Sequence, residues 1–553
     1  MQLKQRNNKS IDIQKKEYNL FIIILCMVVI LLIPLYAVAD YAHPSVDDYS
    51  YGKFASEVWE ETGSVWKVLE NAWERTAYTY ETRQGTFSSI FFMRIQPAIF
   101  GEQYYFLTTV FLLTTFLVCS LFFYVSFFGT LFRASKVQSW LLALVLTIGA
   151  LEFTHVVSDS FYWYNGGVTY TLFFSMEALL FGCLIQMYGA KKKWKKILFG
   201  MLSMFLAFFT CGGNYVTSLV TVEILVFVCF LVSLREYSRK HKQDKLKLPK
   251  VFTKIFTSFY YMTEAKEEKQ EGKWNILFCF FTLCMAVLSF CIVVLAPGNA
   301  IRQEEVGGAR NPIVAILLSF VYGAYSIGNC MNLSAWLLLG FCVPLFAVIA
   351  RNSSFSFRSP LLVTFFSYCL YSSQATPMIY AQGIKIPYRI MNIIYFSCFV
   401  MMSVNVFYWI GYMTKQKANN VMLSKICTWH EVYFWRFYVI AFFIFCFSVA
   451  GGISIEAEVD VDGKAQVEIK ELPATLSACY VLLNGEAKQF DKESWERYAI
   501  YSDDSIKEVE VTPFSVTPDI IFHSDITEDK NNWKNQCVKK YFDKKSVKLK
   551  SFP

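Results

Sequence analysis

Residues 20–39 read LFIIILCMVVILLIPLYAVA, and this run decides the fold class. It contains no charged residue and is as long as a helix that crosses about 30 Å of hydrocarbon. Lys15 and Lys16 lie just before it. A cleaved signal peptide would have a shorter apolar core. We therefore interpret 20–39 as a first membrane-spanning helix whose N-terminal side is cytoplasmic.

Further apolar blocks of similar length follow, so the sequence predicts about eleven transmembrane helices in all. The chain has 553 residues, 55% of them hydrophobic and only 17% charged, whereas soluble domains carry about 25% charged residues. Runs this long must be helical, because lipid offers no partner to open backbone groups. The later blocks are 104–130, 139–154, 168–189, 197–213, 216–234, 275–296, 333–350, 359–376, 389–413 and 434–452.

Basic residues gather in the loops that this count places on one side of the membrane. A dense cluster lies at 191–196, and a long basic loop covers 235–274. Cytoplasmic loops are rich in Lys and Arg, so this loop and the N-terminal segment 1–19 are predicted to be cytoplasmic. The same distribution accounts for the net charge of +8 and argues against nucleic-acid binding. The segment 313–330 stays open between a span and a re-entrant helix.

The tail of the chain has the pattern of a soluble domain. Apolar residues alternate through 453–461 and 465–469 around Asp462-Gly463, which predicts a β-hairpin. A helix at 492–498 and a strand at 509–511 are expected to follow. Cys479 and Cys537 could pair if this tail is exported.

The sequence thus predicts two domains of different class. An all-α polytopic membrane domain covers 20–452, and a small extracytoplasmic α+β domain covers 453–553. Between the first two spans lies an acidic outside loop, 40–103. Within it, Ser64 precedes apolar residues at helical spacing, which predicts a capped amphipathic helix lying in the headgroup layer.

Asp47 and Asp48 are the most informative polar residues of the chain. They occur in PSVDDYSYG at 44–52, shortly after the first span. Adjacent carboxylates repel, and burial would raise the pKa of at least one. One could act as a general base and the other as an orienting group or metal ligand. The alternative is a solvated turn, because Asp is common between Pro and Gly.

A phosphate-bearing substrate would need cations near the same surface. Outside loops of this chain are poor in Lys and Arg, so the exceptions stand out as candidate phosphate-binding residues, because Arg can hold phosphate oxygens in pairs. The alternative is an interfacial anchor for lipid headgroups. The candidates are Arg83 and Arg94 in the first outside loop, Arg302 and Arg310 after the block 275–296, and Lys385 and Arg389.

The spans, the acidic pair and the exported tail together resemble the GT-C superfamily of integral-membrane glycosyltransferases, which use lipid-phosphate-linked sugars. More closely, four segments look like an uncharacterised family of bacterial membrane proteins with GT-C-like architecture. These segments are 45–52, 84–90, 296–302 and 533–541. The resemblance covers nearly the whole chain, although its superfamily motif is only an acidic pair. It implies that Asp47 or Asp48 is the base or metal-binding group, with the two as alternatives.

The resemblance predicts transfer of a sugar from a polyprenyl-phosphate carrier to a cell-envelope glycan or other acceptor. The reaction would take place at the outer face of the cell membrane, and a divalent metal is compatible with it but not required. A transporter or flippase is the main alternative, because Glu177 and Glu223 fall within spans. A polysaccharide ligase and a non-enzymatic envelope protein are the others. The aromatic segment 161–164 could stack on a sugar or belong to an interfacial belt.

Overall fold

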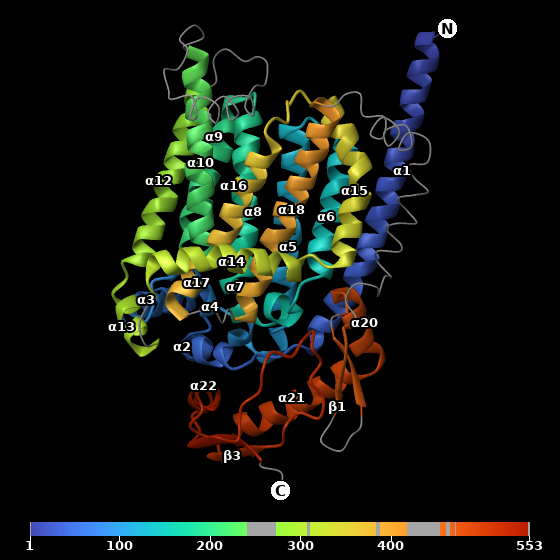
Figure 1. Ribbon diagram of the computed structural model, residues 1–553. Coiled ribbons are helices and arrows are strands. Elements are labelled where there is room, and N and C mark those ends of the chain that lie inside the picture. Colours follow the sequence, from blue (N-terminus) through green and yellow to red (C-terminus); the bar gives the residue numbers. More distant parts are fainter. Residues whose placement is uncertain are drawn as a thin grey trace.

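The computed structural model describes residues 2–240, 272–306, 310–382, 387–416, 454–459, 465–470 and 472–550. Its long helices pack side by side in one bundle (Figure 1). Among the described residues, nine helices are long and apolar enough to cross a membrane, which confirms a multi-helix membrane protein. Their bounds are Lys15–Tyr41, Glu102–Leu131, Tyr164–Gly189, Lys193–Cys211, Tyr215–Leu234, Trp274–Val294, Pro312–Cys330, Leu333–Asn352 and Arg389–Lys415.

Most of the predicted spans coincide with these helices. The predicted spans 139–154 and 359–376 are shorter helices, α6 (Lys136–Glu152) and α16 (Pro360–Ser373), and both run beside the long helices in Figure 1. The predicted span 434–452 lies outside the described residues. The bundle is completed by α1 (Gln2–Ala37), α5 (Leu107–Ser126), α8 (Thr171–Gly189), α9 (Lys193–Cys211), α10 (Tyr215–Lys240), α12 (Gly272–Val294), α15 (Leu333–Asn352) and α18 (Tyr388–Gln416).

The segment that the sequence left open is α14 (Pro312–Cys330), which lies across the bundle rather than along it (Figure 1). It packs against α16, α17 (Thr376–Gln382) and α18. Small residues such as Ala315 and Ser319 face inward, whereas Leu317 and Val321 are more than half exposed. One apolar face is therefore left for lipid, and this orientation favours a helix in the plane of the membrane.

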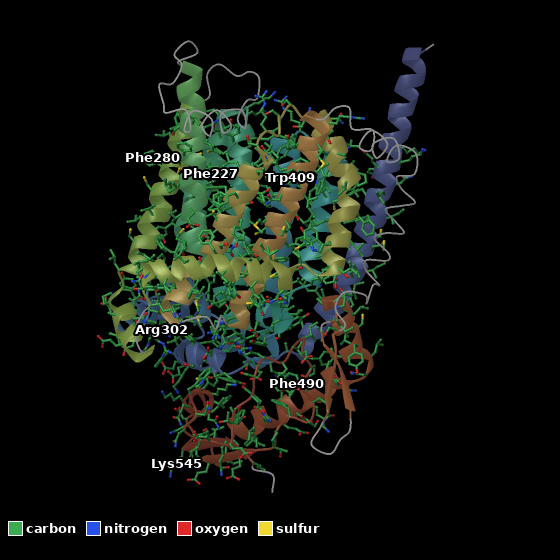
Figure 2. The ribbon with its side chains drawn as sticks, viewed as in Figure 1. Phe227, Phe280, Arg302, Trp409, Phe490 and Lys545 are labelled. Carbon is green, nitrogen blue, oxygen red and sulfur yellow. The ribbon has the colours of Figure 1, made fainter. Side chains whose placement is uncertain are left out.

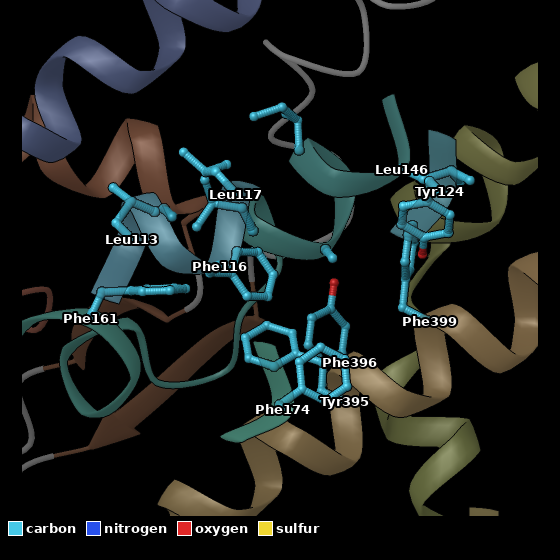
Figure 3. Packing of buried hydrophobic residues seen from close by; sticks show 14 of the residues in the cluster. Leu113, Phe116, Leu117, Tyr124, Leu146, Phe161, Phe174, Tyr395, Phe396 and Phe399 are labelled. Carbon is cyan, nitrogen blue, oxygen red and sulfur yellow. The ribbon is translucent and has the colours of Figure 1, made fainter. Parts of the chain in front are cut away.

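An aromatic cluster ties the end of the bundle to its centre (Figure 3). Phe116 of α5 lies 4.8 Å from Phe396 of α18 and 5.5 Å from Phe161, measured between ring centroids. Phe174 of α8 closes the group at 5.3 Å from Phe396. Such pairs stabilise a core beyond their buried area. Phe161 belongs to the single turn Ser158–Tyr162, so this cluster also holds Asp159 in place.

Short helices cover the end of the bundle that is opposite the N-terminus (Figure 1). The longest is α3 (Val65–Thr82), which begins where predicted, with the Ser64 hydroxyl accepting a hydrogen bond from the Lys67 N–H at 3.5 Å. Its Trp66 and Trp73 are 78% and 64% exposed, as an interfacial helix requires. The others are α2 (Asp47–Thr62), α4 (Phe87–Met93), α7 (Tyr164–Thr169) and α13 (Pro297–Val306).

The C-terminal segment packs on this same end (Figure 1). β1 (Ser454–Val459) pairs with β2 (Ala465–Lys470) as the predicted antiparallel hairpin. α21 (Glu486–Ser502) and β3 (Glu508–Val511) occupy the positions predicted for a helix and a strand. The remaining elements are α20 (Ala474–Leu483), α22 (Trp533–Tyr541) and β4 (Ser546–Leu549), which is parallel to β3. Cys479 and Cys537 are free thiols.

Candidate functional site

Asp47 and Asp48 form the first turn of α2, directly after a strained residue. Val46 has φ 38° and ψ −89°, a conformation that is rare for a β-branched side chain. The Asp48 N–H donates to the Ser45 carbonyl at 2.9 Å, and the Ser45 N–H donates to Asp48 Oδ2 at 3.1 Å. These reciprocal bonds close the turn. Strain of this kind is common at functional sites.

Asp48 is fully buried and links three helices. Its Oδ2 accepts the Tyr105 hydroxyl at 2.6 Å, and its Oδ1 accepts the Asn165 N–H at 3.1 Å. Burial raises the pKa of Asp48 to about 7, against the opposing effect of these hydrogen bonds. Tyr105 leads into α5 and Asn165 lies in α7. Asp48 therefore has a structural task, because it joins α2 to both of these elements.

Asp47 has a different environment from its neighbour. It is only partly buried, and within the described part of the chain it forms neither a hydrogen bond nor an ion pair. Burial raises the pKa of Asp47, while the charges of Arg389, His523 and Arg83 act in the opposite direction. Among the described residues, Asp47 is thus a carboxylate without a hydrogen-bonding partner, and the charges of three cationic side chains act on it.

Two of the four family-like segments meet beside Asp47. The Gly85 N–H donates to Asn299 Oδ1 at 3.0 Å, and Arg302 donates to Gln84. The backbones approach so closely that a Cβ on Gly298 would lie 2.3 Å from the Arg83 nitrogen. Segments 84–90 and 296–302 are therefore joined through backbone contacts that require glycine.

Tyr51 lies within electrostatic range of both this junction and Asp47. Burial raises the pKa of Tyr51, and the charges of Arg83, Asp47, Arg94 and Arg302 also act on it. Arg94 is buried, donates to the Thr79 hydroxyl at 2.7 Å and lies 5.5 Å from the Tyr51 ring.

Figure 2 locates this junction within the whole molecule. Arg302 lies toward the same end as Phe490 and Lys545 of the C-terminal segment, and away from Phe227 and Trp409. Arg302 thus lies at this end of the bundle, and so does Arg83, whose backbone lies against Gly298.

Arg389 approaches Asp47 from α18. Its guanidinium interacts with the Tyr170 hydroxyl and lies close enough to Asp47 and Asp159 for their charges to interact. It is also 6.0 Å from the centroid of the Trp163 ring. Lys385, the other cation predicted in this region, lies outside the described residues.

His523 of the C-terminal segment reaches into the same cluster. Its Nδ1 is 2.6 Å from Asp159 Oδ1. Its ring stacks on Trp163 with centroids 3.6 Å apart and planes inclined by 9°. Within the aromatic segment 161–164, Trp163 is therefore the residue that stacks on this histidine. Sequence reasoning missed the contact, because 364 positions separate the paired residues and no local pattern marks either one.

The fourth family-like segment, 533–541, lies against α2. The Tyr541 hydroxyl donates to Ser56 Oγ at 3.1 Å, and its ring lies 5.1 Å from that of Tyr49. Burial, aided by the charge of Asp47, raises the pKa of Cys537 to about 11. All four segments singled out from the sequence thus meet at one end of the bundle.

Several polar atoms beside this cluster have no hydrogen-bond partner among the described residues. They include Trp163 Nε1 and both side-chain polar atoms of Asn165. Buried polar groups are normally paired, so these atoms could serve a polar ligand. Across all the residues that the structure describes, no group of three or more His, Cys, Asp or Glu side chains could hold a metal ion.

Comparisons with models of protein families, with curated proteins and with solved structures give no match. The GT-C resemblance therefore rests on the sequence features described above and stays a prediction.

Proposed function

We propose that this protein transfers a sugar from a polyprenyl-phosphate carrier to a hydroxyl group of a cell-envelope acceptor. One observation carries the proposal. Among the described residues, Asp47 accepts no hydrogen bond, and the charges of Arg83, Arg389 and His523 act on it at the end of a membrane bundle, whereas Asp48 accepts hydrogen bonds from Tyr105 and Asn165. A carboxylate within reach of the charges of two guanidinium groups suits a reaction that needs both a base and an anion-binding group.

Asp47 is the proposed base, in preference to Asp48. It would accept the proton of the acceptor hydroxyl as that oxygen attacks the anomeric carbon of the sugar. The bond between this carbon and the carrier phosphate breaks, and the phosphate leaves with its electron pair. Proton acceptance by a positioned base contributes about 10²–10⁴ in rate.

Arg83 and Arg389 are the proposed ligands of the departing phosphate. Both act on Asp47 through their charges, so one substrate could reach the base and both cations. Arg302 is secondary, because its charge is not among those that act on Asp47, and it donates to Gln84. Guanidinium groups bind phosphate oxygens in pairs, and their charge stabilises the negative charge that develops on the leaving group.

The surroundings of the site suit a lipid-linked donor. α3 exposes Trp66 and Trp73, and α14 exposes an apolar face that includes Leu317 and Val321. Such surfaces lie at the boundary between hydrocarbon and water. The prenyl chain would stay in lipid while its phosphate reaches the cations. We place this end of the bundle outside the cell, because the basic N-terminal segment belongs to the other end (Figure 1).

A transporter or flippase is the second candidate, and buried carboxylates in the bundle favour it. Glu177 accepts a hydrogen bond from the Thr221 hydroxyl at 2.9 Å, and Glu223 accepts one from the Ser373 hydroxyl at 2.6 Å. Carboxylates within a membrane domain are costly and commonly mark a pathway. Both are nevertheless satisfied by hydroxyl groups, which is also a structural arrangement.

A donor-cleavage assay distinguishes the two candidates. The purified protein is reconstituted in lipid vesicles with a polyprenyl phosphate that carries a radiolabelled sugar. Transfer moves the label from the organic phase into a water-soluble or acceptor-bound product. Transport would leave the sugar on its carrier and change only the leaflet in which the lipid resides. If the label stays carrier-bound with every envelope fraction offered as acceptor, the transfer proposal is wrong.

A further inference from the structure

We propose that His523 is a positioning residue: by holding Asp159, it leaves Arg389 available to bind an anionic phosphate beside Asp47. The inference rests on the proposed function and adds a role for the C-terminal segment. That segment would then complete the anion-binding site of the membrane domain.

Asp159 lies between two candidate partners. It is buried, with 7% of its surface exposed, and it belongs to the turn that Phe161 anchors in the aromatic core. His523 is hydrogen-bonded to it at 2.6 Å. Arg389 is near enough to feel its charge, but no ion pair joins the two within the described part of the chain. The histidine therefore takes the contact that the arginine could make.

Removing His523 would change this balance. A buried carboxylate that loses its partner is strongly unfavourable, and a guanidinium group offers a carboxylate two parallel hydrogen bonds. Arg389 is the cation whose charge already interacts with Asp159. It would be drawn into an ion pair there, and its affinity for a phosphate beside Asp47 would fall.

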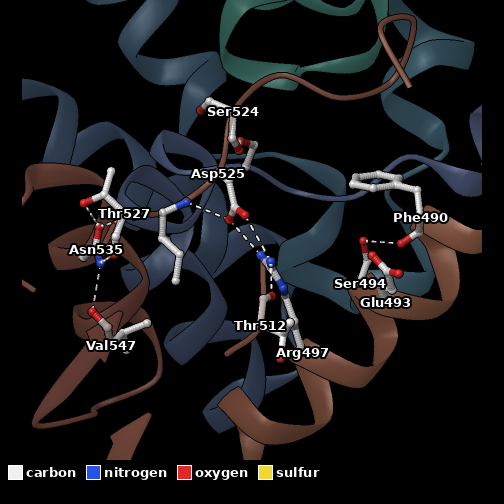
Figure 4. A network of polar contacts seen from close by, with 12 residues as sticks. Phe490, Glu493, Ser494, Arg497, Thr512, Ser524, Asp525, Thr527, Asn535 and Val547 are labelled. Carbon is white, nitrogen blue, oxygen red and sulfur yellow. Dashed lines mark hydrogen bonds and ion pairs between the residues drawn. The ribbon is translucent and has the colours of Figure 1, made fainter. Parts of the chain in front are cut away.

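The residues that follow His523 are fixed by a network of polar contacts within the C-terminal segment (Figure 4). Two residues further on, Asp525 receives two hydrogen bonds from Arg497, at 2.7 and 3.0 Å. Asn535 receives the Thr527 N–H at 2.8 Å and donates back to the Thr527 carbonyl at 2.6 Å.

A bond to the membrane domain completes this support. The Ser45 hydroxyl donates to the Ser524 carbonyl at 3.0 Å, only two residues before Asp47. This hydrogen bond joins the C-terminal segment to the turn that carries Asp47, the proposed base.

Substitutions at His523 and Asp159 test whether His523 and Arg389 compete for the Asp159 carboxylate. His523→Ala removes the partner of Asp159. His523→Asn keeps an N–H group that can still donate to the carboxylate. His523→Ala combined with Asp159→Asn removes the carboxylate that would attract Arg389, and Asp159→Asn alone completes the double-mutant cycle. The probe is a short-chain polyprenyl phosphate without sugar, titrated calorimetrically into the full-length protein in detergent.

We expect His523→Ala to weaken binding of this probe by about tenfold or more, which corresponds to the loss of one charge-assisted contact. His523→Asn should bind within about threefold of the wild type. In the Asp159→Asn background, His523→Ala should have no further effect. A double variant as weak as His523→Ala would overturn the inference, as would unchanged binding by His523→Ala. If the wild type itself fails to bind the probe, the proposed function is the part that is wrong.

Discussion

At the scale of single residues, the adjacent carboxylates differ because their neighbours differ. Asp48 accepts hydrogen bonds at both of its oxygens, from Ser45, Tyr105 and Asn165. Asp47 accepts none from the described residues. The sequence pointed to the pair but could not separate its members, because Tyr105 and Asn165 are 57 and 117 positions away from Asp48.

This difference predicts that the same substitution lowers stability at Asp48 and leaves it unchanged at Asp47. Asp48→Asn would turn an amide NH₂ toward the N–H of Ser45 or Asn165, so a buried hydrogen bond is lost and two donors face each other. We expect a cost of about 1–3 kcal/mol. Asp47→Asn loses no such bond and should unfold at the temperature of the wild type. Thermal unfolding in detergent checks this; equal melting temperatures for both variants would contradict the structural role of Asp48.

At the scale of elements, the sequence predicted those whose signal is local. The Ser64 cap, the helix after it and the β-hairpin each follow from neighbouring residues, and the structure has all three. α14 could not be assigned in this way. Length and apolarity are the same for a helix that spans a membrane and for one that lies in its plane, and only packing against other helices separates them.

The junction of α13 with the turn after α3 gives a prediction at this scale. A Cβ on Gly298 would lie 2.3 Å from the backbone nitrogen of Arg83 and 2.7 Å from the backbone nitrogen of Gln84. Gly298→Ala should therefore push Arg83 away from Asp47 and destabilise the protein by about 1–3 kcal/mol. Activity should fall with it.

Gly340→Ala is the matched control for this substitution. Gly340 lies in α15, and, apart from its chain neighbours and its own helix backbone, no atom of the described residues lies within 4 Å of the position its Cβ would take. The control should be neutral or slightly stabilising, because alanine favours helices over glycine. Melting temperatures and transfer rates of both variants are the measurement. A Gly298→Ala protein that behaves like the control would show that the close contact is not needed.

At the scale of the whole molecule, hydrogen bonds join the C-terminal segment to the bundle at several points. Thr475 of α20 donates its N–H to Glu152 of α6 at 3.0 Å. His43 lies between Glu102, at 3.0 Å, and Asp491 of α21, at 2.9 Å. The sequence predicted that the segment exists but not where it binds, because these pairs join distant parts of the chain and depend on the finished fold.

The hydrogen bonds of His43 to Glu102 and Asp491 predict that the stability of the protein depends on pH. Burial by itself would lower the pKa of His43, but the hydrogen bonds and charges of Asp491 and Glu102 outweigh it, so the pKa is raised. A histidine of this kind stabilises the fold fully below its ordinary pKa, near 6.5. This contribution is lost as the pH rises through the higher value of the folded state, by about 1.4 kcal/mol for each unit of the shift.

We therefore expect the wild type to melt at a lower temperature as the pH is raised from about 6 to about 9. His43→Gln removes the titrating group, so its melting temperature should change less over the same range. Phe490 and Trp495 pack on the imidazole but do not ionise, which leaves the two carboxylates as its charged neighbours. Parallel curves for wild type and variant would exclude His43 as the source.

The central claim is that Asp47 is the base of a sugar-transfer reaction, and the turnover number of Asp47→Asn tests it most directly. Asp40→Asn is the matched control, because Asp40 is an exposed aspartate at the end of the first span and has no part in the site. Both proteins are reconstituted at equal amounts with the labelled lipid-linked donor and an acceptor. We expect Asp47→Asn to lower kcat by about 10²-fold or more, with its melting temperature unchanged, and Asp40→Asn to match the wild type. Full activity in Asp47→Asn would contradict the claim.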